Sequence, residues 1–252
     1  MRIAVAGGTG TIGRHAVDLL RRGGHEVVVL TTSTGVDLTT GRGLEGRLVD
    51  CHRVLDLSNT RADAGREQSE AFFSASARNL LSAAHEAGVG HIAFLSIVGA
   101  DVVDLGYYHG KRRQEELVTT GPLPWTLLRA TQLHEFAAQL LDVADGPVVY
   151  VPPMLTQPVA AIDVATRLVE LVTGPARGTV PPIAGPDALW VADMARRVLA
   201  RRGVSRQVET LPVSDALALQ LAGGDLVPEG EFLSATTTFG QYLDGLVPAG
   251  RV

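Results

Sequence analysis

A chain of 252 residues, 46% of them hydrophobic, is long enough to bury the core of one large α/β domain with an extension, and too apolar to be disordered. Its net charge of −5 argues against nucleic-acid binding, which needs clustered basic surface. The single cysteine, Cys51, excludes a disulfide framework and four-cysteine zinc sites. No apolar run approaches the roughly 18 residues of a membrane span, and the first strand starts at Arg2 without room for a signal peptide. We therefore expect a soluble, cytoplasmic protein.

Strands and helices alternate along the first 150 residues. An apolar strand over residues 2–6 leads into a glycine-rich turn, and a helix over 14–22 ends at Gly23 and Gly24. Further strands are predicted at 26–31, 53–57, 91–95 and 125–129. Further helices are predicted at 66–87, 107–119 and 132–143. Because strands that alternate with helices form βαβ units, the sequence predicts an α/β fold with an open parallel sheet.

One connection in this series is unusually short. Only residues 32–36 separate the second strand from the segment Val36-Asp37-Leu38. A parallel crossover normally takes a dozen or more residues, so no full helix fits there. The segment is either a vestigial strand or a loop across the sheet edge. In both cases, the part of a nucleotide pocket that would hold the adenine should be smaller than usual.

The composition changes after about residue 150, where prolines cluster. Helices are predicted there at 162–173, 191–202 and 214–222. We interpret residues 151–252 as a smaller, loop-rich cap that is interleaved with the first domain, residues 1–150.

The glycine-rich turn has the spacing of a dinucleotide-binding loop. It fits Gly8-x-Gly10-x-x-Gly13, and it follows the first strand directly and opens the first helix, as that motif requires. Glycines let the backbone approach a pyrophosphate, and the helix N-terminus supplies amide donors and a positive dipole end. The predicted contacts are Gly7, Thr9, Gly10, Thr11, Ile12, Gly13 and Arg14.

The end of the second strand indicates which dinucleotide binds. An acidic residue there would hold the ribose 2′-hydroxyl of NAD, whereas this chain has Thr31, Thr32 and Ser33. Hydroxyl groups can donate to a 2′-phosphate, and Arg14 follows the last glycine of the turn. The sequence therefore favours NADP(H) over NAD(H).

Lys111 is the only lysine of the chain and lies four residues after Tyr107, so the two side chains share a face of the predicted helix. A cation within about 4–6 Å typically lowers the pKa of a phenol by about 1–3 units, which would make Tyr107 a proton donor or acceptor near neutral pH. The charged run over residues 112–116 is interpreted as the solvated face of the same helix.

Polar residues also lie at the ends of two other strands. Ser96 ends one strand, and Ser58 and Asn59 end another, at the carboxyl edge where open α/β sheets bind ligands. His134 and Glu135 do not form a zinc-protease motif, because Ala138 stands where the second histidine would be. We therefore predict no metal site and place His134 at a helix start that faces a substrate.

In combination, these segments resemble the short-chain dehydrogenase/reductase superfamily and, within it, the atypical NmrA-like members. The similarity extends over about residues 1–170. The matching segments are the Gly7–Gly13 turn, Val36-Asp37-Leu38, Asp56-Leu57-Ser58-Asn59, Ser96-Ile97-Val98-Gly99, Tyr107-x-x-x-Lys111 and Leu128-Arg129-Ala130-Thr131. The resemblance implies a Rossmann-type doubly wound parallel sheet that binds NAD(P)(H), followed by a small C-terminal substrate cap.

The resemblance also implies roles for single residues. Asp37 would lie near the adenine amine, Lys111 would hold the nicotinamide ribose, and Tyr107 would be the catalytic acid or base. Ser96 would be the third catalytic residue, but Ile97 stands where many members have a second serine, so the register of this strand end is open. The remaining cofactor contacts implied at strand ends are Leu57, Ser58, Asn59, Ala130 and Thr131.

The leading hypothesis is an NAD(P)H-dependent oxidoreductase that reduces a carbonyl or quinone-like small molecule, with Tyr107 as proton donor and with His134 and Tyr108 on the substrate side. One alternative is a non-catalytic, NADP(H)-sensing regulatory protein. Another is a non-redox epimerase or dehydratase. The intact Tyr–Lys pair favours an enzyme. Neither nucleic acid nor a membrane is expected as a partner, and a homodimer is expected as in many relatives.

Overall fold

The computed structural model describes residues 1–61 and 64–246. The chain forms two compact units. The first comprises residues 1–129 and 164–181, and the second comprises residues 130–163 and those from 182 onward. In neither described stretch is there a helix both long and apolar enough to cross a membrane.

The first unit is built on a parallel sheet. Its strands are β1 (Arg2–Ala6), β2 (Glu26–Leu30), β3 (Arg53–Asp56), β4 (Ile92–Ile97), β5 (Trp125–Ala130) and the short β8 (Gly178–Thr179). Neighbouring strands follow the order β5-β4-β3-β1-β2, and β8 pairs with β5. The chain thus leaves β1 for β2 on one side and returns to β3 on the other, which places a topological switch point beside β1. The predicted α/β class with a parallel sheet is confirmed.

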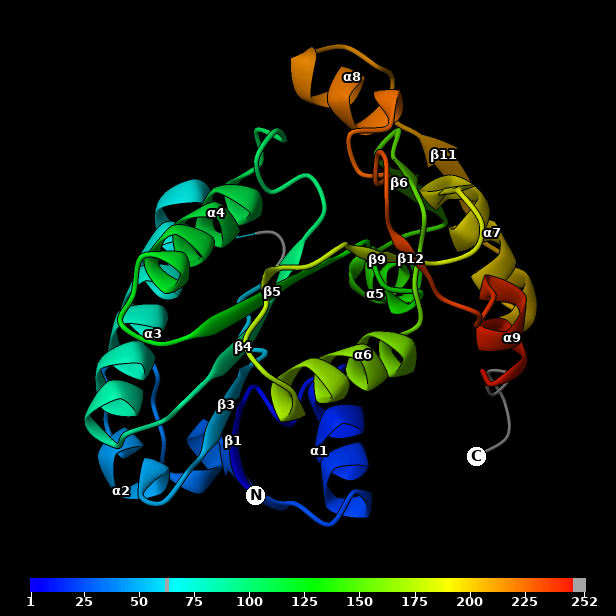
Figure 1. Cartoon of the computed structure of the whole chain (residues 1–252). Helices are drawn as coiled ribbons and strands as arrows, with labels where there is room; N and C mark the ends of the chain where they lie inside the picture. Colours follow the sequence, from blue (N-terminus) through cyan, green and yellow to red (C-terminus); the bar gives the residue numbers. More distant parts are fainter. Residues whose placement is uncertain (62–63, 247–252) are drawn as a thin grey trace. The chain divides into compact units, whose positions relative to one another are not determined.

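Helices cover both faces of this sheet. Figure 1 shows α2, α3 and α4 on one face and α1 and α6 on the other. Their bounds are α1 Gly13–Arg22, α2 Leu44–Leu48, α3 Arg66–Glu86, α4 Gly106–Thr119 and α6 Ala161–Thr173. A parallel sheet has to be covered in this way because both of its faces are apolar.

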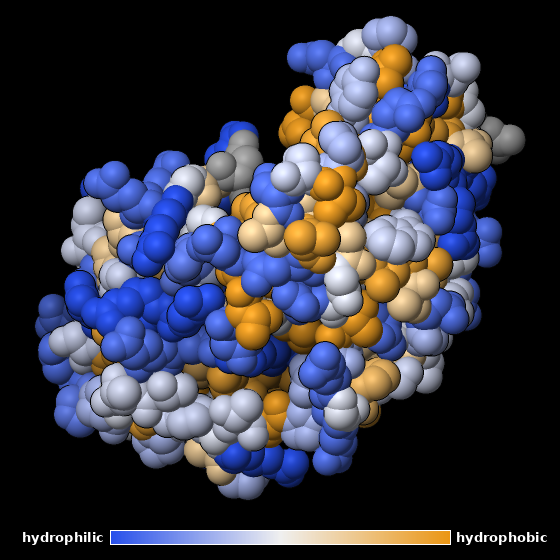
Figure 2. All heavy atoms as spheres, turned by 90° about the horizontal axis from the view of Figure 1, so that it is seen from above, coloured by the Kyte–Doolittle hydropathy of each residue, from blue (hydrophilic) through white to orange (hydrophobic). Residues whose placement is uncertain are grey.

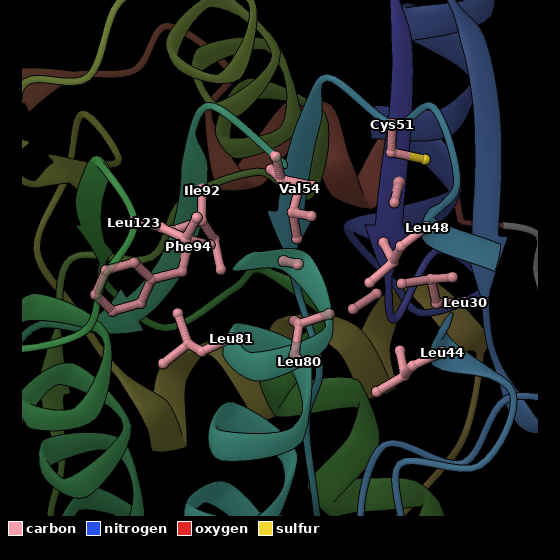
Figure 3. Close-up of a cluster of buried hydrophobic side chains, with 14 of the residues drawn as sticks. Leu30, Leu44, Leu48, Cys51, Val54, Leu80, Leu81, Ile92, Phe94 and Leu123 are labelled. Atoms are coloured by element: carbon pink, nitrogen blue, oxygen red, sulfur yellow. The ribbon is translucent and has the colours of Figure 1, made fainter. Parts of the chain in front are cut away.

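The core of the first unit lies between the sheet and the helices α2 and α3. Leu80 and Leu81 of α3 lie beside Ile92 and Phe94 of β4 in Figure 3, and all belong to one cluster of buried side chains. Along α3, the buried positions include Phe73, Ala77, Leu80, Leu81 and Ala84, which follow the three-and-four spacing of a helix face.

Several sequence predictions need correction in detail. Residues 36–38 form no strand, so the loop interpretation is the right one, and a short 3-10 helix over Thr32–Thr34 precedes them. Strand β4 continues to Ile97, so Ser96 lies inside the strand rather than at its end. Helix α2 was not predicted, because five residues are too few for a periodic signal. Helix α5 begins at Glu135 rather than at 132.

The second unit contains short paired strands and four helices among its described residues. The helices are α5 (Glu135–Val143), α7 (Val191–Arg202), α8 (Ala216–Gly223) and α9 (Phe239–Asp244). The strands are β6 (Val148–Val151), β7 (Leu155–Thr156), β9 (Ile183–Ala184), β10 (Leu189–Trp190), β11 (Gln207–Thr210) and β12 (Leu233–Ser234). β6 pairs with β11 and β9 with β12 in parallel, and β7 pairs with β10 antiparallel. On the face drawn in Figure 2, apolar side chains form several patches among hydrophilic ones.

Two glycines allow α4 to pack closely on α3. A Cβ atom added at Gly106 would lie 2.6 Å from the backbone nitrogen of Arg66. One added at Gly110 would lie 2.6 Å from Cδ2 of Phe73 and 2.9 Å from the carbonyl carbon of Ser69. Because Phe73 is fully buried, neither the ring nor the backbone can withdraw into open space.

We therefore expect Gly110→Ala to destabilise the protein. Overpacking a core costs about 1–3 kcal/mol, which outweighs the roughly 0.8–1.0 kcal/mol that alanine gains over glycine in a helix. The matched control is Gly46→Ala in α2, where an added Cβ atom has no neighbour within 4 Å and the helix should gain stability. Urea unfolding measures both, and equal or greater stability of Gly110→Ala would contradict the packing argument.

Candidate functional site

The glycine-rich turn lies against the end of β3 at the carboxyl edge of the sheet. Gly7 has a φ of +71°, and a Cβ atom there would lie 2.3 Å from the carbonyl oxygen of Leu57. A Cβ atom at Gly13 would lie 2.1 Å from the carbonyl oxygen of Gly7. Both positions therefore require glycine, and the turn is held within backbone contact of the segment that follows β3.

The N-terminus of α1 has the properties of an anion site. Its N-cap residue, Ile12, makes no side-chain capping hydrogen bond, and the first turn contains no acidic residue. The first amides of the helix are therefore not satisfied by a side-chain cap, and the dipole favours a negative group. Thr9 and Arg14 are exposed beside this turn, while Thr11 is half-buried. These residues fit the pyrophosphate of a dinucleotide.

The turn that follows β2 is rich in hydroxyl groups and is touched by an arginine. Thr31 Oγ1 lies 2.9 Å from Ser33 Oγ, and the Thr31 amide donates to Thr34 Oγ1 at 3.1 Å. Arg47 Nη2 donates to the Thr34 carbonyl oxygen at 2.8 Å. Arg47 was missed in the sequence because it lies on the unpredicted helix α2. The structure thus brings a cation that the sequence analysis did not identify, Arg47, to the region predicted to select between NADP and NAD.

The side chain of Asp37 accepts hydrogen bonds from residues of its own turn. Its Oδ1 atom accepts hydrogen bonds from the Thr39 hydroxyl at 2.7 Å and the Thr39 amide at 2.9 Å. The hydrogen bonds from Thr39 hold the pKa of this carboxyl below its ordinary value. The carboxylate is therefore ionised at neutral pH, and it lies in the loop where the adenine contact was predicted.

Two serine hydroxyls at the same edge of the sheet are buried without a hydrogen-bond partner among the described residues. They are Oγ of Ser58, after β3, and Oγ of Ser96, in β4. Their residues are 4% and 3% exposed. Because a buried hydroxyl without a partner costs free energy, both atoms are suited to meet a polar ligand.

Helix α4 carries Tyr107 and Lys111 to this edge, but their side chains have separate partners. The Tyr107 hydroxyl donates to Asn59 Oδ1 at 2.9 Å. Lys111 Nζ donates to the Leu95 carbonyl oxygen and to Gln114 Oε1, both at 3.0 Å, and lies 4.5 Å from the ring centre of Phe73.

The pKa shifts of this pair differ from the sequence prediction. Burial raises the pKa of Tyr107 above its ordinary value, opposed only by its hydrogen bond to Asn59. The expectation that Lys111 lowers the pKa of this phenol is therefore wrong. Burial lowers the pKa of Lys111 to about 8, while the carboxylates of Asp56 and Glu115 act in the opposite direction.

The charged run over residues 112–116 is not a solvated face throughout. Gln114 is 0% exposed and Glu115 is 9% exposed. Arg129 forms a bidentate pair with Glu115, at 2.8 and 3.0 Å, and a further pair with Asp101 at 3.0 Å. The helix buries Lys111, Gln114 and Glu115 because they fall on the face toward the sheet, and each finds a polar partner there.

The predicted residues of the second unit are buried in its interior. Thr131 Oγ1 donates to the Gln157 carbonyl oxygen at 2.5 Å. His134 is fully buried, with Nε2 2.9 Å from the Pro158 carbonyl oxygen and its ring 5.5 Å from those of Phe239 and Tyr242. A substrate contact from His134, as predicted, would require some of the surrounding side chains to move, because the residue is 0% exposed. Burial also lowers the pKa of His134, so the imidazole is neutral at pH 7.

Two other predicted residues are likewise enclosed. Ala130 is 3% exposed. Tyr108, in the first unit, is also 3% exposed and packs edge-on against the Tyr107 ring. Within residues 1–61 and 64–246, no group of three His, Cys, Asp or Glu side chains could hold a metal ion.

Comparison with solved structures supports the fold. An NADPH-dependent quinone oxidoreductase from Escherichia coli, complexed with NADPH, superimposes with a TM-score of 0.70 at 20% identity, covering 96% of this chain and 98% of that one. A UDP-glucose 4-epimerase from Thermus thermophilus in complex with NAD gives 0.69 at 19%, covering 98% and 100%. A short-chain dehydrogenase/reductase superfamily protein from Agrobacterium tumefaciens with bound NAD gives 0.69 at 19%, covering 97% and 95%.

Comparison of the sequence itself identifies the family. No curated protein matches the chain. A family model described as NAD(P)H-binding matches residues 7–175, which include the glycine-rich turn, Tyr107 and Lys111. Because that match spans well over half of the chain, this protein belongs to the NAD(P)H-binding family.

Proposed function

We propose that the protein is an NADPH-dependent reductase of a carbonyl or quinone-like small molecule. The observation that carries the proposal is the hydrogen bond between Tyr107 and Asn59. Asn59 lies two residues after Leu57, whose carbonyl oxygen touches the glycine-rich turn. The phenol is therefore hydrogen-bonded to the short segment that borders the glycine-rich turn.

Each residue then has a defined task. The bound dinucleotide would supply the hydride. The amides at the start of α1 would hold its pyrophosphate, and the Lys111 ammonium would hold a ribose hydroxyl. Burial keeps the Tyr107 phenol protonated at neutral pH, so Tyr107 would serve as a proton donor to the substrate oxygen.

The cofactor preference rests on charge at the end of β2. No carboxylate stands at Thr31, Thr32 or Ser33, and Arg47 contacts the same turn. A 2′-phosphate would meet hydroxyl donors and guanidinium groups there, and charge-assisted hydrogen bonds of this kind contribute about 1.5–3 kcal/mol.

A rival function is favoured by one feature of the site. Lys111 is 4% exposed and its Nζ atom is hydrogen-bonded within the protein, as expected if the Tyr–Lys pair only shapes a dinucleotide-binding surface. In that case the protein would sense NADP(H) without turnover. Oxidation of NADPH in the presence of a panel of ketones and quinones separates the two functions.

We expect NADPH to bind more tightly than NADH. Arg14→Ala and Arg47→Ala should each weaken NADPH binding by about tenfold or more, because each removes a cation from the 2′-phosphate, and should change NADH binding much less. Titration calorimetry measures the dissociation constants of both dinucleotides for the unmodified protein and for each variant. Arg22→Ala, at the other end of α1, is the control that should leave both unchanged. A lower dissociation constant for NADH would contradict the assignment.

We expect Tyr107→Phe to lower kcat by about 10²–10⁴ on a confirmed substrate, the usual effect of losing a general acid. Cofactor affinity should change little, because the proposed ribose contact is made by Lys111. Tyr150→Phe, at a tyrosine that is 66% exposed in the second unit, is the matched control and should retain full activity. Full activity of Tyr107→Phe would show that another group supplies the proton.

A further inference from the structure

A buried glutamine connects the lysine to an aspartate in the sheet. Gln114 is 0% exposed, and both ends of its side-chain amide are used. Its Oε1 atom accepts a hydrogen bond from Lys111 Nζ at 3.0 Å, and its Nε2 atom donates to Asp56 Oδ2 at 2.9 Å. The other oxygen of Asp56, Oδ1, accepts from the Ser58 amide at 2.9 Å. A continuous chain of hydrogen bonds thus runs from the end of β3 to the ammonium.

The chemistry of the two partners fixes the orientation of this amide. A lysine ammonium only donates hydrogen bonds, and an ionised carboxylate only accepts them. Gln114 therefore has to present its oxygen to Lys111 and its nitrogen to Asp56. If the amide were rotated by 180°, its oxygen would face the acceptor oxygen of Asp56 and its nitrogen would face the donor ammonium of Lys111. Both contacts are unfavourable inside a protein.

We propose that Gln114 is a positioning residue for Lys111: it holds the ammonium at one end of a buried hydrogen-bond chain whose other end is anchored on Asp56. The proposal deepens the proposed function and rests on it for the role of Lys111 toward the ribose. The anchoring itself depends only on hydrogen bonds within the chain and can be tested without any cofactor.

A glutamine at this position has a different effect from a direct ion pair. A carboxylate in contact with Nζ would form a strong ion pair with the ammonium. The neutral amide of Gln114 instead contributes one acceptor, and its side chain lies between Nζ and the Asp56 carboxylate. Among the described residues, the hydrogen bonds of Nζ go to Leu95 and Gln114. An ammonium has three N–H groups, so these two hydrogen bonds leave one that the proposed ribose contact would use.

The charged groups that face Lys111 are few. Asp56 faces it from β3, and Glu115 lies on its own helix, where it is paired with Arg129 at 2.8 Å. On α3, the face of the Phe73 ring lies 4.5 Å from Nζ, which also favours a cation. Gln114 Oε1 is the side-chain oxygen in direct contact with Nζ, so its removal should make the charged form of Lys111 less stable.

The test uses the fact that Lys111 is the only lysine. Protein labelled with [13Cε]lysine gives one lysine signal, whose shift against pH reports the pKa of this side chain directly. We expect a midpoint near 8 in the unmodified protein. Gln114→Met keeps the length of the side chain and loses both hydrogen bonds, and it should lower the midpoint by about one unit. Gln114→Glu places a carboxylate beside Nζ and should raise it.

A matched control and a second readout separate positioning from general stability. Gln68→Met makes the same change at an exposed glutamine on α3 and should leave the midpoint unchanged. NADPH affinity, measured by fluorescence titration at pH 7, should fall about threefold to tenfold in Gln114→Met, because a misplaced ammonium loses part of one charge-assisted contact.

The outcomes are distinguishable. If the unmodified protein binds no dinucleotide, the proposed function fails while the lysine titration still tests Gln114. If Gln114→Met is folded by circular dichroism and its midpoint is unchanged, the positioning role is wrong. If Gln114→Met does not fold, Gln114→Glu decides alone: a raised midpoint supports the role, and an unchanged or lowered one overturns it.

Discussion

The candidate site depends on the close contact between α3 and α4 at Phe73. The Phe73 ring lies 5.8 Å from the Tyr107 ring and 4.5 Å from Lys111 Nζ. Its Cδ2 atom occupies the space that a side chain at Gly110 would need. A single aromatic side chain of α3 therefore packs against α4 at Gly110 and contacts both residues of the pair. Without this close approach, the Lys111 ammonium could not reach the Leu95 carbonyl oxygen.

Burial of the ammonium explains why this chain, with 21 arginines and one lysine, has the lysine here. A guanidinium has five N–H groups in a planar fork and would need more acceptors than the Leu95 carbonyl oxygen and one amide oxygen supply. The compact ammonium fits this small set of partners. Unlike a guanidinium, it can also lose its proton at moderate pH, and burial lowers the pKa of Lys111 to about 8.

The sequence predicts the edge of the sheet better than the interior of the site. The glycine spacing over residues 7–13 and the polar residues after β3 follow from local chemistry, because each turn accepts few residue types. The partners of Lys111 could not be found in this way. Gln114 lies in a charged run, and only the packing of α4 on α3 and the sheet shows that it is buried. Helix α2, which carries Arg47, was missed because five residues give no periodic pattern.

The burial of Tyr107 in the same packing favours reduction over oxidation in the proposed reaction. An oxidation would need the Tyr107 phenolate as base, and burial makes that anion costly to form. A reduction needs the neutral phenol as donor, and the Asn59 oxygen already orients its hydroxyl group. The hydrogen bonds of Lys111 Nζ among the described residues go to Leu95 and Gln114 rather than to this hydroxyl. The phenol therefore stays protonated until a substrate oxygen of higher basicity competes for its proton, which is the situation of an alkoxide formed by hydride transfer.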